Sequence, residues 1–288
     1  MKLFAPAKLN LYLHITGRRQ DGLHLLDTLI VFTDFCDVLT LSVADTLSLT
    51  VSGEFSPLLV NIPLEKNIVY RAAKCLKDRY HIQSGVHIHL EKRIPIGAGL
   101  GGGSSDAAAV LIGLNALWNI HADQKTLREI GLSLGADVPV CIAQKPALVR
   151  GIGEHIDPLD FSMEKTAALL IAPPLVLSTQ LVYQTFHQQN RSFSEITHHT
   201  FSKDNSDHLI KNLSDNHNDL EYSAITLQPQ IQMILNNLSE QAGCKLARMS
   251  GSGAACFALF ASKNEAEDAQ KRLLTIYPDF WSMVSQIV

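Results

Sequence analysis

The chain has 288 residues, of which 24 are lysine or arginine, 28 are aspartate or glutamate and 46% are hydrophobic. These proportions are typical of a globular protein and exclude a disordered or collagen-like chain. Because the charges nearly balance and form no basic block, we expect no binding to nucleic acid. The five cysteines lie far apart, which indicates reduced thiols, and no apolar run reaches the length of a membrane span. We therefore expect a cytoplasmic protein that does not bind membranes.

The first 150 residues alternate between strand-like and helix-like stretches. The expected strands, which are rich in β-branched and aromatic residues, are at residues 9–15, 28–35, 37–43, 46–51 and 85–96. The helical spacing of apolar residues predicts helices at residues 67–80, 107–118 and 124–134. Gly135 is expected to end the last of these helices.

The second half follows a glycine-containing, hairpin-like segment at residues 150–159. Its expected elements are strands at residues 167–173, 244–249, 255–261 and 281–288 and helices at residues 230–242 and after Ser262. Ser262 and Glu265 have the spacing of a capping box. Residues 190–218 are poor in apolar residues and predict a long irregular loop. The sequence thus indicates an α+β protein with domains at residues 1–155 and 156–288.

The stretch GAGLGGGSSD, at residues 97–106, places five glycines immediately before a helix. Glycines let successive backbone N–H groups converge on an anion, and the N-terminus of the following helix adds further donors. The pattern therefore favours a phosphate-binding loop. The alternative is a purely structural role, in which the glycines only allow the chain to enter the helix and bind no ligand.

Three known phosphate loops fit this stretch poorly. The P-loop pattern fails because Gly103 stands where its lysine is required. The dinucleotide fingerprint is satisfied by Gly97, Gly99 and Gly102, but Asp123 lies in a turn between helices, where that fold needs the end of a strand. The protein-kinase glycine loop has the same spacing, yet no H-R-D or D-F-G motif follows it.

Three stretches carry a more specific pattern. They are APAKLNLYLHITGRRQDGLH at residues 5–24, PIGAGLGGGSSDA at residues 95–107 and MSGSGAACFALF at residues 249–260. In order and spacing they resemble the motifs of the superfamily of galactokinase, homoserine kinase, mevalonate kinase and phosphomevalonate kinase. Together with LGADVPV at residues 134–140, they are most similar to the branch that phosphorylates 4-(cytidine 5'-diphospho)-2-C-methyl-D-erythritol. The resemblance spans essentially the whole chain.

The resemblance implies both a fold and a reaction. The fold would be a two-domain kinase fold, with an N-terminal ATP-binding domain, a C-terminal ferredoxin-like α/β sandwich and the active site in the cleft between them. The reaction would transfer the γ-phosphoryl group of ATP, with Mg²⁺, to the 2-hydroxyl of the cytidine diphosphate sugar-alcohol. Such a transfer depends mainly on positioning and charge neutralisation.

The resemblance also assigns roles to individual residues. Asp137 would be the general base, with Lys8 beside it to stabilise negative charge. The residues that would wrap the triphosphate are Pro95, Ile96, Gly97, Ala98, Gly99, Leu100, Gly101, Gly102, Gly103, Ser104 and Ser105, and Ser104 is the candidate ligand of Mg²⁺. The residues that would contact the acceptor are Asn10, His24, Thr179 and Tyr183, with His24 reading the cytosine edge and Tyr183 stacking on the base. Leu23 departs from the branch, which usually has tyrosine there.

Several alternatives remain open on sequence alone. Asp137 also fits a helix N-cap two residues before Pro139, and the two roles can coexist. His87 and His89 alternate on one strand face, where a solvated face is the simpler interpretation than a metal site. Among functions, the alternatives are a kinase of the same superfamily for mevalonate, homoserine or a sugar, an ATP-dependent decarboxylase, and a catalytically silent nucleotide-binding regulator.

Overall fold

The computed structural model describes residues 1–160, 163, 166–197 and 206–288. Its residues fall into two compact units, each built from three stretches of the chain. The first unit holds Met1–Lys8, Phe35–Ile96 and Gly101–Lys145, and the second holds Leu9–Asp34, Gly97–Leu100 and Pro146–Val288. A boundary near residue 155 stays a prediction.

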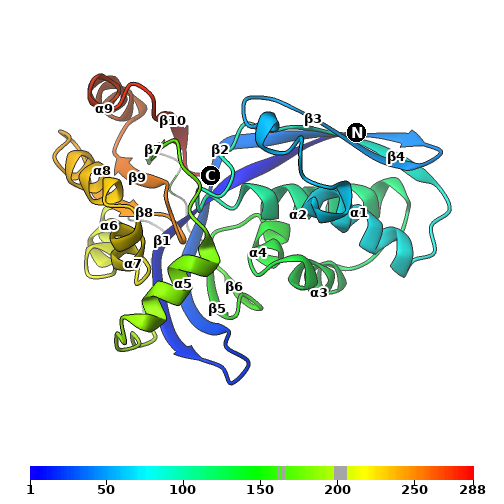
Figure 1. Cartoon of the computed structure of the whole chain (residues 1–288), viewed down its shortest axis with the longest axis horizontal. Coiled ribbons are helices and arrows are strands. Elements are labelled where there is room, and N and C mark those ends of the chain that lie inside the picture. The colour runs from blue at the N-terminus through cyan, green and yellow to red at the C-terminus, as the bar shows by residue number, and fades with distance from the viewer. Residues whose placement is uncertain (161–162, 164–165, 198–205) are drawn as a thin grey trace. The chain divides into compact units, whose positions relative to one another are not determined.

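Groups of strands and groups of helices follow one another along the chain (Figure 1). The strands are β1 (Lys2–Arg18), β2 (His24–Ala44), β3 (Leu47–Ser52), β4 (Gly85–Glu91), β5 (Ala147–Gly151), β6 (His155–Pro158), β7 (Ala167–Ala172), β8 (Leu246–Met249), β9 (Cys256–Phe260) and β10 (Trp281–Gln286). The α-helices are α1 (Ile68–Arg79), α2 (Gly102–Leu117), α3 (Gln124–Leu134), α4 (Val138–Ala143), α5 (Thr179–Gln188), α6 (Ser206–Ser214), α7 (Glu221–Leu227), α8 (Gln230–Ser239) and α9 (Lys263–Ile276), and short 3₁₀ turns lie at Ser56–Leu58 and Leu64–Lys66.

In the first unit, helix α2 is buried on strands β1 and β2. A side chain on Gly113 would come within 2.4 Å of Leu3 and 2.8 Å of Leu41, so the glycine allows the helix to lie directly on the strands. Residues 38–44 of β2 pair antiparallel with β4, and β3 pairs parallel with β4. Helices α1 and α4 pack against α2. This packing fixes the start of α2, where the glycine loop joins it.

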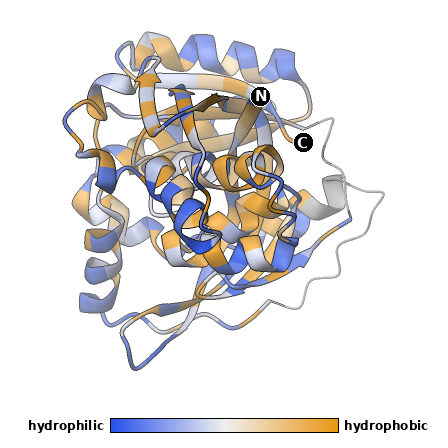
Figure 2. Ribbon diagram, turned by 90° about the vertical axis from the view of Figure 1, so that its right-hand side faces the viewer, coloured by the Kyte–Doolittle hydropathy of each residue, from blue (hydrophilic) through white to orange (hydrophobic). Residues whose placement is uncertain are grey.

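In the second unit, four antiparallel strands form a sheet in the order β10-β7-β9-β8. Helices α8 and α9 pack against this sheet, and Leu169, Phe260, Ile234 and Leu273 belong to the shared core. This unit is therefore an α/β sandwich. Residues 26–30 of β2 pair with β5, which forms an antiparallel hairpin with β6. Hydrophilic and hydrophobic stretches alternate along the helical ribbons, as expected for helices with one buried face (Figure 2).

Most predicted elements are confirmed. The strands predicted at residues 28–35 and 37–43 are one continuous strand, β2, and two further predictions differ for physical reasons. The predicted strand at residues 85–96 ends at Glu91, because the carboxylate of Asp37 accepts the backbone N–H groups of Arg93 and Ile94 in place of a strand partner. The irregular loop predicted for residues 190–218 is wrong at Ser206–Ser214, which form helix α6. Part of that prediction, at residues 198–205, lies outside the described residues. Helix α5 was not predicted. Within the described part of the chain, no helix is long and apolar enough to cross a membrane.

Candidate functional site

Lys8 and Asp137 form an ion pair in the first unit. Lys8 Nζ lies 3.3 Å from Asp137 Oδ2, and the side chain of Lys8 is 4% exposed whereas that of Asp137 is 40% exposed. Asp137 precedes α4 at the N-cap position, but its side chain makes no capping hydrogen bond. The carboxylate is therefore directed to the lysine instead of the helix, and one of its sides remains accessible to a ligand.

The glycine loop brings the start of α2 against the stem of Lys8. Gly97, Gly99 and Gly101 all have positive φ angles, a conformation that glycine adopts without strain. Gly101 is the N-cap of α2, and a side chain there would come within 2.5 Å of Lys8 Cγ. The N–H groups of the first turn of α2 are thus held next to the buried lysine, which is an arrangement suited to a phosphate group.

A buried trio of charges lies beside Gly102 in the first unit. Lys92 Nζ contacts the carboxylates of both Asp37 and Asp106, and its distance to Asp106 Oδ2 is 2.7 Å. A side chain on Gly102 would come within 2.9 Å of Lys92 Nζ. Burial raises the pKa of the Asp106 carboxyl to about 7; Lys92 opposes the rise and Asp37 adds to it. The trio ties the end of β4 to the first turns of α2.

The first half of the loop, residues 97–100, belongs to the second unit and is held by the turn after β8. Ser250 Oγ donates a hydrogen bond of 3.0 Å to the carbonyl of Gly99, and the backbone N–H of Ala255 donates to the carbonyl of Ala98. A side chain on Gly99 would come within 2.2 Å of the Ser250 carbonyl oxygen. The backbone of Asn10 donates to the same Ser250 hydroxyl at 3.3 Å.

His24 stacks against helix α5 in the second unit. Its ring lies 4.9 Å from that of Tyr183 and meets Phe186 edge-on at 6.1 Å. Burial lowers the pKa of His24, and the neighbouring Arg18 and His187 lower it further, so the ring is held neutral. Among the described residues, its buried Nε2 has no hydrogen-bond partner. A neutral imidazole with one unsatisfied nitrogen is suited to hydrogen bonding with a nucleobase edge.

Two further predicted residues have defined partners in this unit. Asn10 Nδ2 donates to Thr28 Oγ1 at 2.9 Å. Thr179 Oγ1 lies 2.8 Å from Ser252 Oγ, so the first residue of α5 is joined to the turn that also holds Gly99. The hydroxyl groups of Ser250 and Ser252 thus connect the second-unit residues Asn10, Gly99 and Thr179 to one turn.

Ser104 and Ser105 differ in accessibility. Ser105 is fully buried, and its Oγ has no hydrogen-bond partner among the described residues, whereas Ser104 is only partly buried. Groups of three or more histidine, cysteine or acidic side chains able to hold a metal ion are absent from the described part of the chain. The two histidines of β4 have hydroxyl groups of β3 as partners. His87 contacts Ser48 and Thr50, and His89 contacts Thr50 and Ser52.

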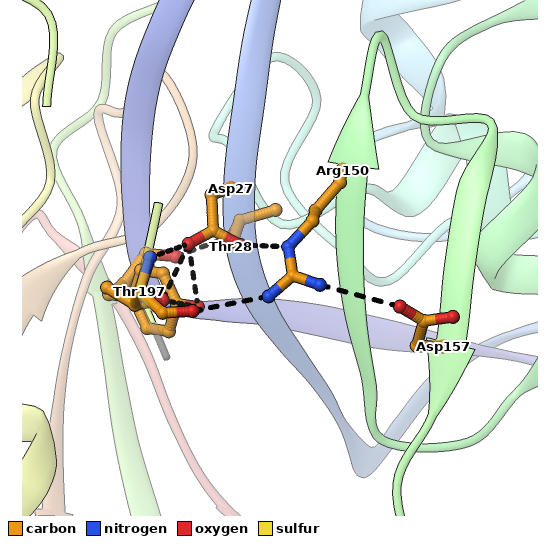
Figure 3. Close-up of polar contacts among 6 residues, drawn as sticks. Asp27, Thr28, Arg150, Asp157 and Thr197 are labelled. Atoms are coloured by element: carbon orange, nitrogen blue, oxygen red, sulfur yellow. Dashed lines mark hydrogen bonds and ion pairs between the residues drawn. The ribbon is translucent and has the colours of Figure 1, made fainter. Parts of the chain in front are cut away.

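A second buried charge network, in the second unit, surrounds Asp27 (Figure 3). Its carboxylate accepts hydrogen bonds from Arg150 Nε at 2.9 Å and from the backbone N–H and hydroxyl of Thr197 at 2.8 and 2.6 Å. Tyr12 Oη lies 2.7 Å from Thr197 Oγ1, and burial raises the pKa of the Tyr12 hydroxyl. The network fastens the segment before residue 198 to β1, β2 and β5.

Comparisons with known proteins identify the family. Residues 67–145 match the family model for the GHMP kinases N terminal domain, and residues 202–279 match that for GHMP kinases C terminal. A curated protein of Paramagnetospirillum magneticum named 4-diphosphocytidyl-2-C-methyl-D-erythritol kinase is 40% identical over 284 residues, which cover 99% of this chain and 97% of that protein. A protein of the same name from Mesorhizobium japonicum is 42% identical, with 96% and 92% of the two chains covered.

Solved structures give the same grouping. A crystal structure of 4-(cytidine 5'-diphospho)-2C-methyl-D-erythritol kinase superposes with a TM-score of 0.78 at 32% identity and covers 99% of both chains. Homoserine kinase from Cytophaga hutchinsonii has a TM-score of 0.69 at 18% identity and covers 100% of this chain and 94% of its own, which shows a shared fold.

The sequence analysis missed Lys92, Asp37 and Asp106. Asp106 gave a usable signal, because it is an acidic residue inside an otherwise apolar helix and so needs a buried partner. Which cation it would meet depends on how β4 and α2 pack, and the spacing of residues does not contain that information.

Proposed function

The chain belongs to the GHMP kinase family, and we propose that it uses ATP to phosphorylate the 2-hydroxyl of 4-(cytidine 5'-diphospho)-2-C-methyl-D-erythritol. The reaction is a step of isoprenoid precursor synthesis by the non-mevalonate route. The observation that carries this proposal is the near full-length similarity, at 40% identity, to kinases named for that substrate. The residues described above supply groups suited to each part of the reaction.

Asp137 acts as the general base in this proposal. Its accessible carboxylate accepts the proton of the 2-hydroxyl as the oxygen attacks the γ-phosphorus of ATP, and ADP departs. Lys8 stabilises the negative charge that spreads over the transferred phosphoryl group, because its ammonium is buried beside Asp137 and the loop. A positioned base of this kind contributes at least about a hundredfold to the rate.

The glycine loop binds the ATP phosphates through backbone N–H groups at the start of α2. Mg²⁺ is expected with the nucleotide, where it would neutralise phosphate charge, and it usually keeps several waters and few protein ligands. The partly buried Ser104 is the protein ligand that we propose.

The acceptor contacts Asn10, His24, Thr179 and Tyr183 in this proposal. The neutral ring of His24 hydrogen-bonds the cytosine through Nε2, and Tyr183 supplies an aromatic face. Leu23 is 48% exposed, so it can offer only an aliphatic surface to the base. We also propose that the enzyme works in the cytoplasm, where its five free cysteines stay reduced.

Release of ADP from Mg-ATP with separate candidate alcohols tests the function. We expect ADP with 4-(cytidine 5'-diphospho)-2-C-methyl-D-erythritol and none with mevalonate, homoserine or galactose. Phosphorus NMR of the product should show a new phosphomonoester on the intact alcohol, which also distinguishes a kinase from a decarboxylase. ADP with another alcohol would contradict the assigned acceptor, and ATP binding without turnover in every well would favour a silent regulator.

A further inference from the structure

Asn218 is a buried amide that follows helix α6 and has no assigned role in the reaction. It is 4% exposed and forms an isolated bridge with Leu13 of β1. Its Oδ1 accepts a hydrogen bond from the backbone N–H of Leu220 at 3.0 Å. Its Nδ2 donates to two backbone carbonyls, that of Met249 at 2.9 Å and that of Gly251 at 2.7 Å. The carboxamide therefore uses its acceptor and both of its donor hydrogens.

These partners allow one orientation of the Asn218 amide. A backbone N–H can only donate and a carbonyl can only accept, so Oδ1 must face Leu220 and the NH₂ group must face the two carbonyls. Glu221 accepts the backbone N–H of Met249 at 3.2 Å, so the same short segment holds the turn after β8 at three backbone groups. Residues 249–253 are buried, and a carbonyl that loses Asn218 there loses its partner away from solvent.

The two carbonyls lie on either side of Ser250, through which the turn holds the glycine loop. Ser250 is fully buried, and its hydroxyl donates to the carbonyl of Gly99 at 3.0 Å. The backbone N–H of Ala255 donates to the carbonyl of Ala98 at 2.9 Å, which joins the turn to the loop a second time. All of these residues belong to the second unit. Asn218 thus holds the backbone before and after the serine that contacts Gly99.

We propose that Asn218 is a positioning residue for nucleotide binding, because it fixes the turn that holds the glycine loop in one conformation. Gly97 and Gly99 have no side chains with which to pack and can adopt many backbone conformations, so contacts from the turn restrict them. A loop that is already ordered loses less conformational entropy when its ligand binds. This role rests on the proposed function, since it concerns the loop that binds the ATP phosphates.

Equilibrium binding of ATP to Asn218→Asp and Asn218→Ala tests the proposal. Aspartate keeps the acceptor for Leu220 but has no NH₂ group, and alanine removes the same donors without adding a buried charge. We expect the dissociation constant for ATP to rise about tenfold in both variants. The kcat at saturating ATP should change less than about threefold, because bound ATP itself orders the loop. Unchanged ATP affinity in both variants, or a fall in kcat alone, would overturn the proposal.

Asn237→Asp is the matched control, because Asn237 makes the same kind of contacts elsewhere in the second unit. Its Nδ2 donates to the carbonyl of Met233 at 2.8 Å and to Tyr277 Oη at 2.9 Å. We expect this variant to lose stability in urea unfolding, as Asn218→Asp does, but to bind ATP as the wild type does. An equal loss of ATP affinity in Asn237→Asp would overturn the proposal, since lowered stability alone would then account for the effect.

A double-mutant cycle shows whether Asn218 acts through the turn. Ser250→Ala removes the hydroxyl that holds Gly99, so adding Asn218→Asp to it should weaken ATP binding much less than Asn218→Asp weakens it in the wild type. Additive losses of affinity would mean that Asn218 acts by another route.

NMR provides a readout that needs neither turnover nor ATP. The backbone amide signals of Gly97 and Gly99 should shift in Asn218→Asp and stay unchanged in Asn237→Asp. Unchanged glycine signals in Asn218→Asp would overturn the proposal whatever the chain phosphorylates. If the wild type binds ATP but is inactive on the cytidine compound, while affinity and glycine signals change as expected, the proposed function fails and the positioning role stands.

Discussion

Lys8 and Asp137 are unequal partners, because the lysine side chain is 4% exposed and the aspartate 40% exposed. A pair with one exposed member contributes little to folding stability. The burial of the ammonium is therefore better explained by function than by stability. In the proposed mechanism it keeps a positive charge next to the loop and leaves one side of the carboxylate accessible.

Replacing Asp137 by asparagine separates chemistry from binding. Asp137→Asn should lower kcat by at least about a hundredfold, because the amide cannot accept the hydroxyl proton. The dissociation constant for ATP should stay within about twofold. Asp123→Asn is a suitable control, since Asp123 caps α3 and asparagine caps equally well. A kcat within tenfold of wild type would exclude Asp137 as the base.

Lys92 faces two buried carboxylates, so its single positive charge cannot balance both. We therefore expect the free energy of unfolding to depend on pH. The pKa of Asp106 is raised by burial to about 7, from 3.8 for an ordinary aspartate, so the folded state keeps a proton that the unfolded chain releases. The contribution of this group to stability is complete below about pH 4 and is lost as the pH rises through about 7. The loss is at most about 1.4 kcal/mol for each pH unit.

Urea unfolding of Asp106→Asn at several pH values measures this effect. The asparagine cannot ionise, so its stability relative to wild type should increase from pH 5 to pH 7 and level off above. A constant offset caused by altered packing does not affect this slope. Parallel pH profiles of the two proteins would show that Asp106 is ionised throughout, with Lys92 as its compensating charge.

The start of helix α2 depends on two glycines in different ways. Gly101 has a φ of +67° and lies against Lys8, so Gly101→Ala combines backbone strain with a 2.5 Å clash. We expect it to lower the unfolding free energy by about 1 kcal/mol or more and kcat at least about tenfold. The nearest atom to a side chain on Gly103 is 3.6 Å away, so Gly103→Ala should leave stability unchanged or raised. Equal stability losses in the two variants would contradict this distinction.

The segment that ends at Thr197 is held by the carboxylate of Asp27. Asp27 is fully buried, and Arg150, whose side chain is 30% exposed, is its counter-ion. Arg150→Met should cost about 2–3 kcal/mol of unfolding free energy, less than for a fully buried pair, because Thr197 still donates to the carboxylate. The control Arg93→Met removes an exposed pair with Glu91 and should cost about 0.5 kcal/mol or less. Similar costs, measured by urea unfolding, would mean that Asp27 needs no cation.

Local sequence signals correctly predicted the elements whose ends are determined by residues within the element itself. The capping box at Ser262 and Glu265 forms as expected, and helix α3 begins at a capping aspartate and ends before Gly135. Helix α6 was missed because its sequence is polar and its stability comes from contacts such as that of buried Leu213. The loop was recognisable from glycine density. Its contacts with Lys92 and Ser250 come from residues distant in sequence, and the spacing of residues cannot predict them.

Each compact unit consists of stretches that are separated in the sequence, so cutting the chain at one place divides a unit. The second unit contains residues 9–34 and 97–100 in addition to the C-terminal half. Leu13 and Ile15 of β1 belong to its hydrophobic core together with Leu169 and Phe260. Ser285 Oγ and the backbone of Gln286 both donate to Asp34, so β10 is also fastened to a residue of the N-terminal half.

A cut at residue 155 therefore tests the predicted boundary directly. We expect the fragment 156–288 to lack a fixed core when expressed alone. The fragment does not contain β1, so the buried side chains of Leu13 and Ile15 are missing from its core. Its proton NMR spectrum should show little dispersion, and adding the fragment 1–155 should restore dispersion and, if the proposed function holds, kinase activity. The full-length chain is the control. A well-dispersed spectrum of the isolated fragment would show that the C-terminal half folds independently and that the contacts of β1 are dispensable for its core.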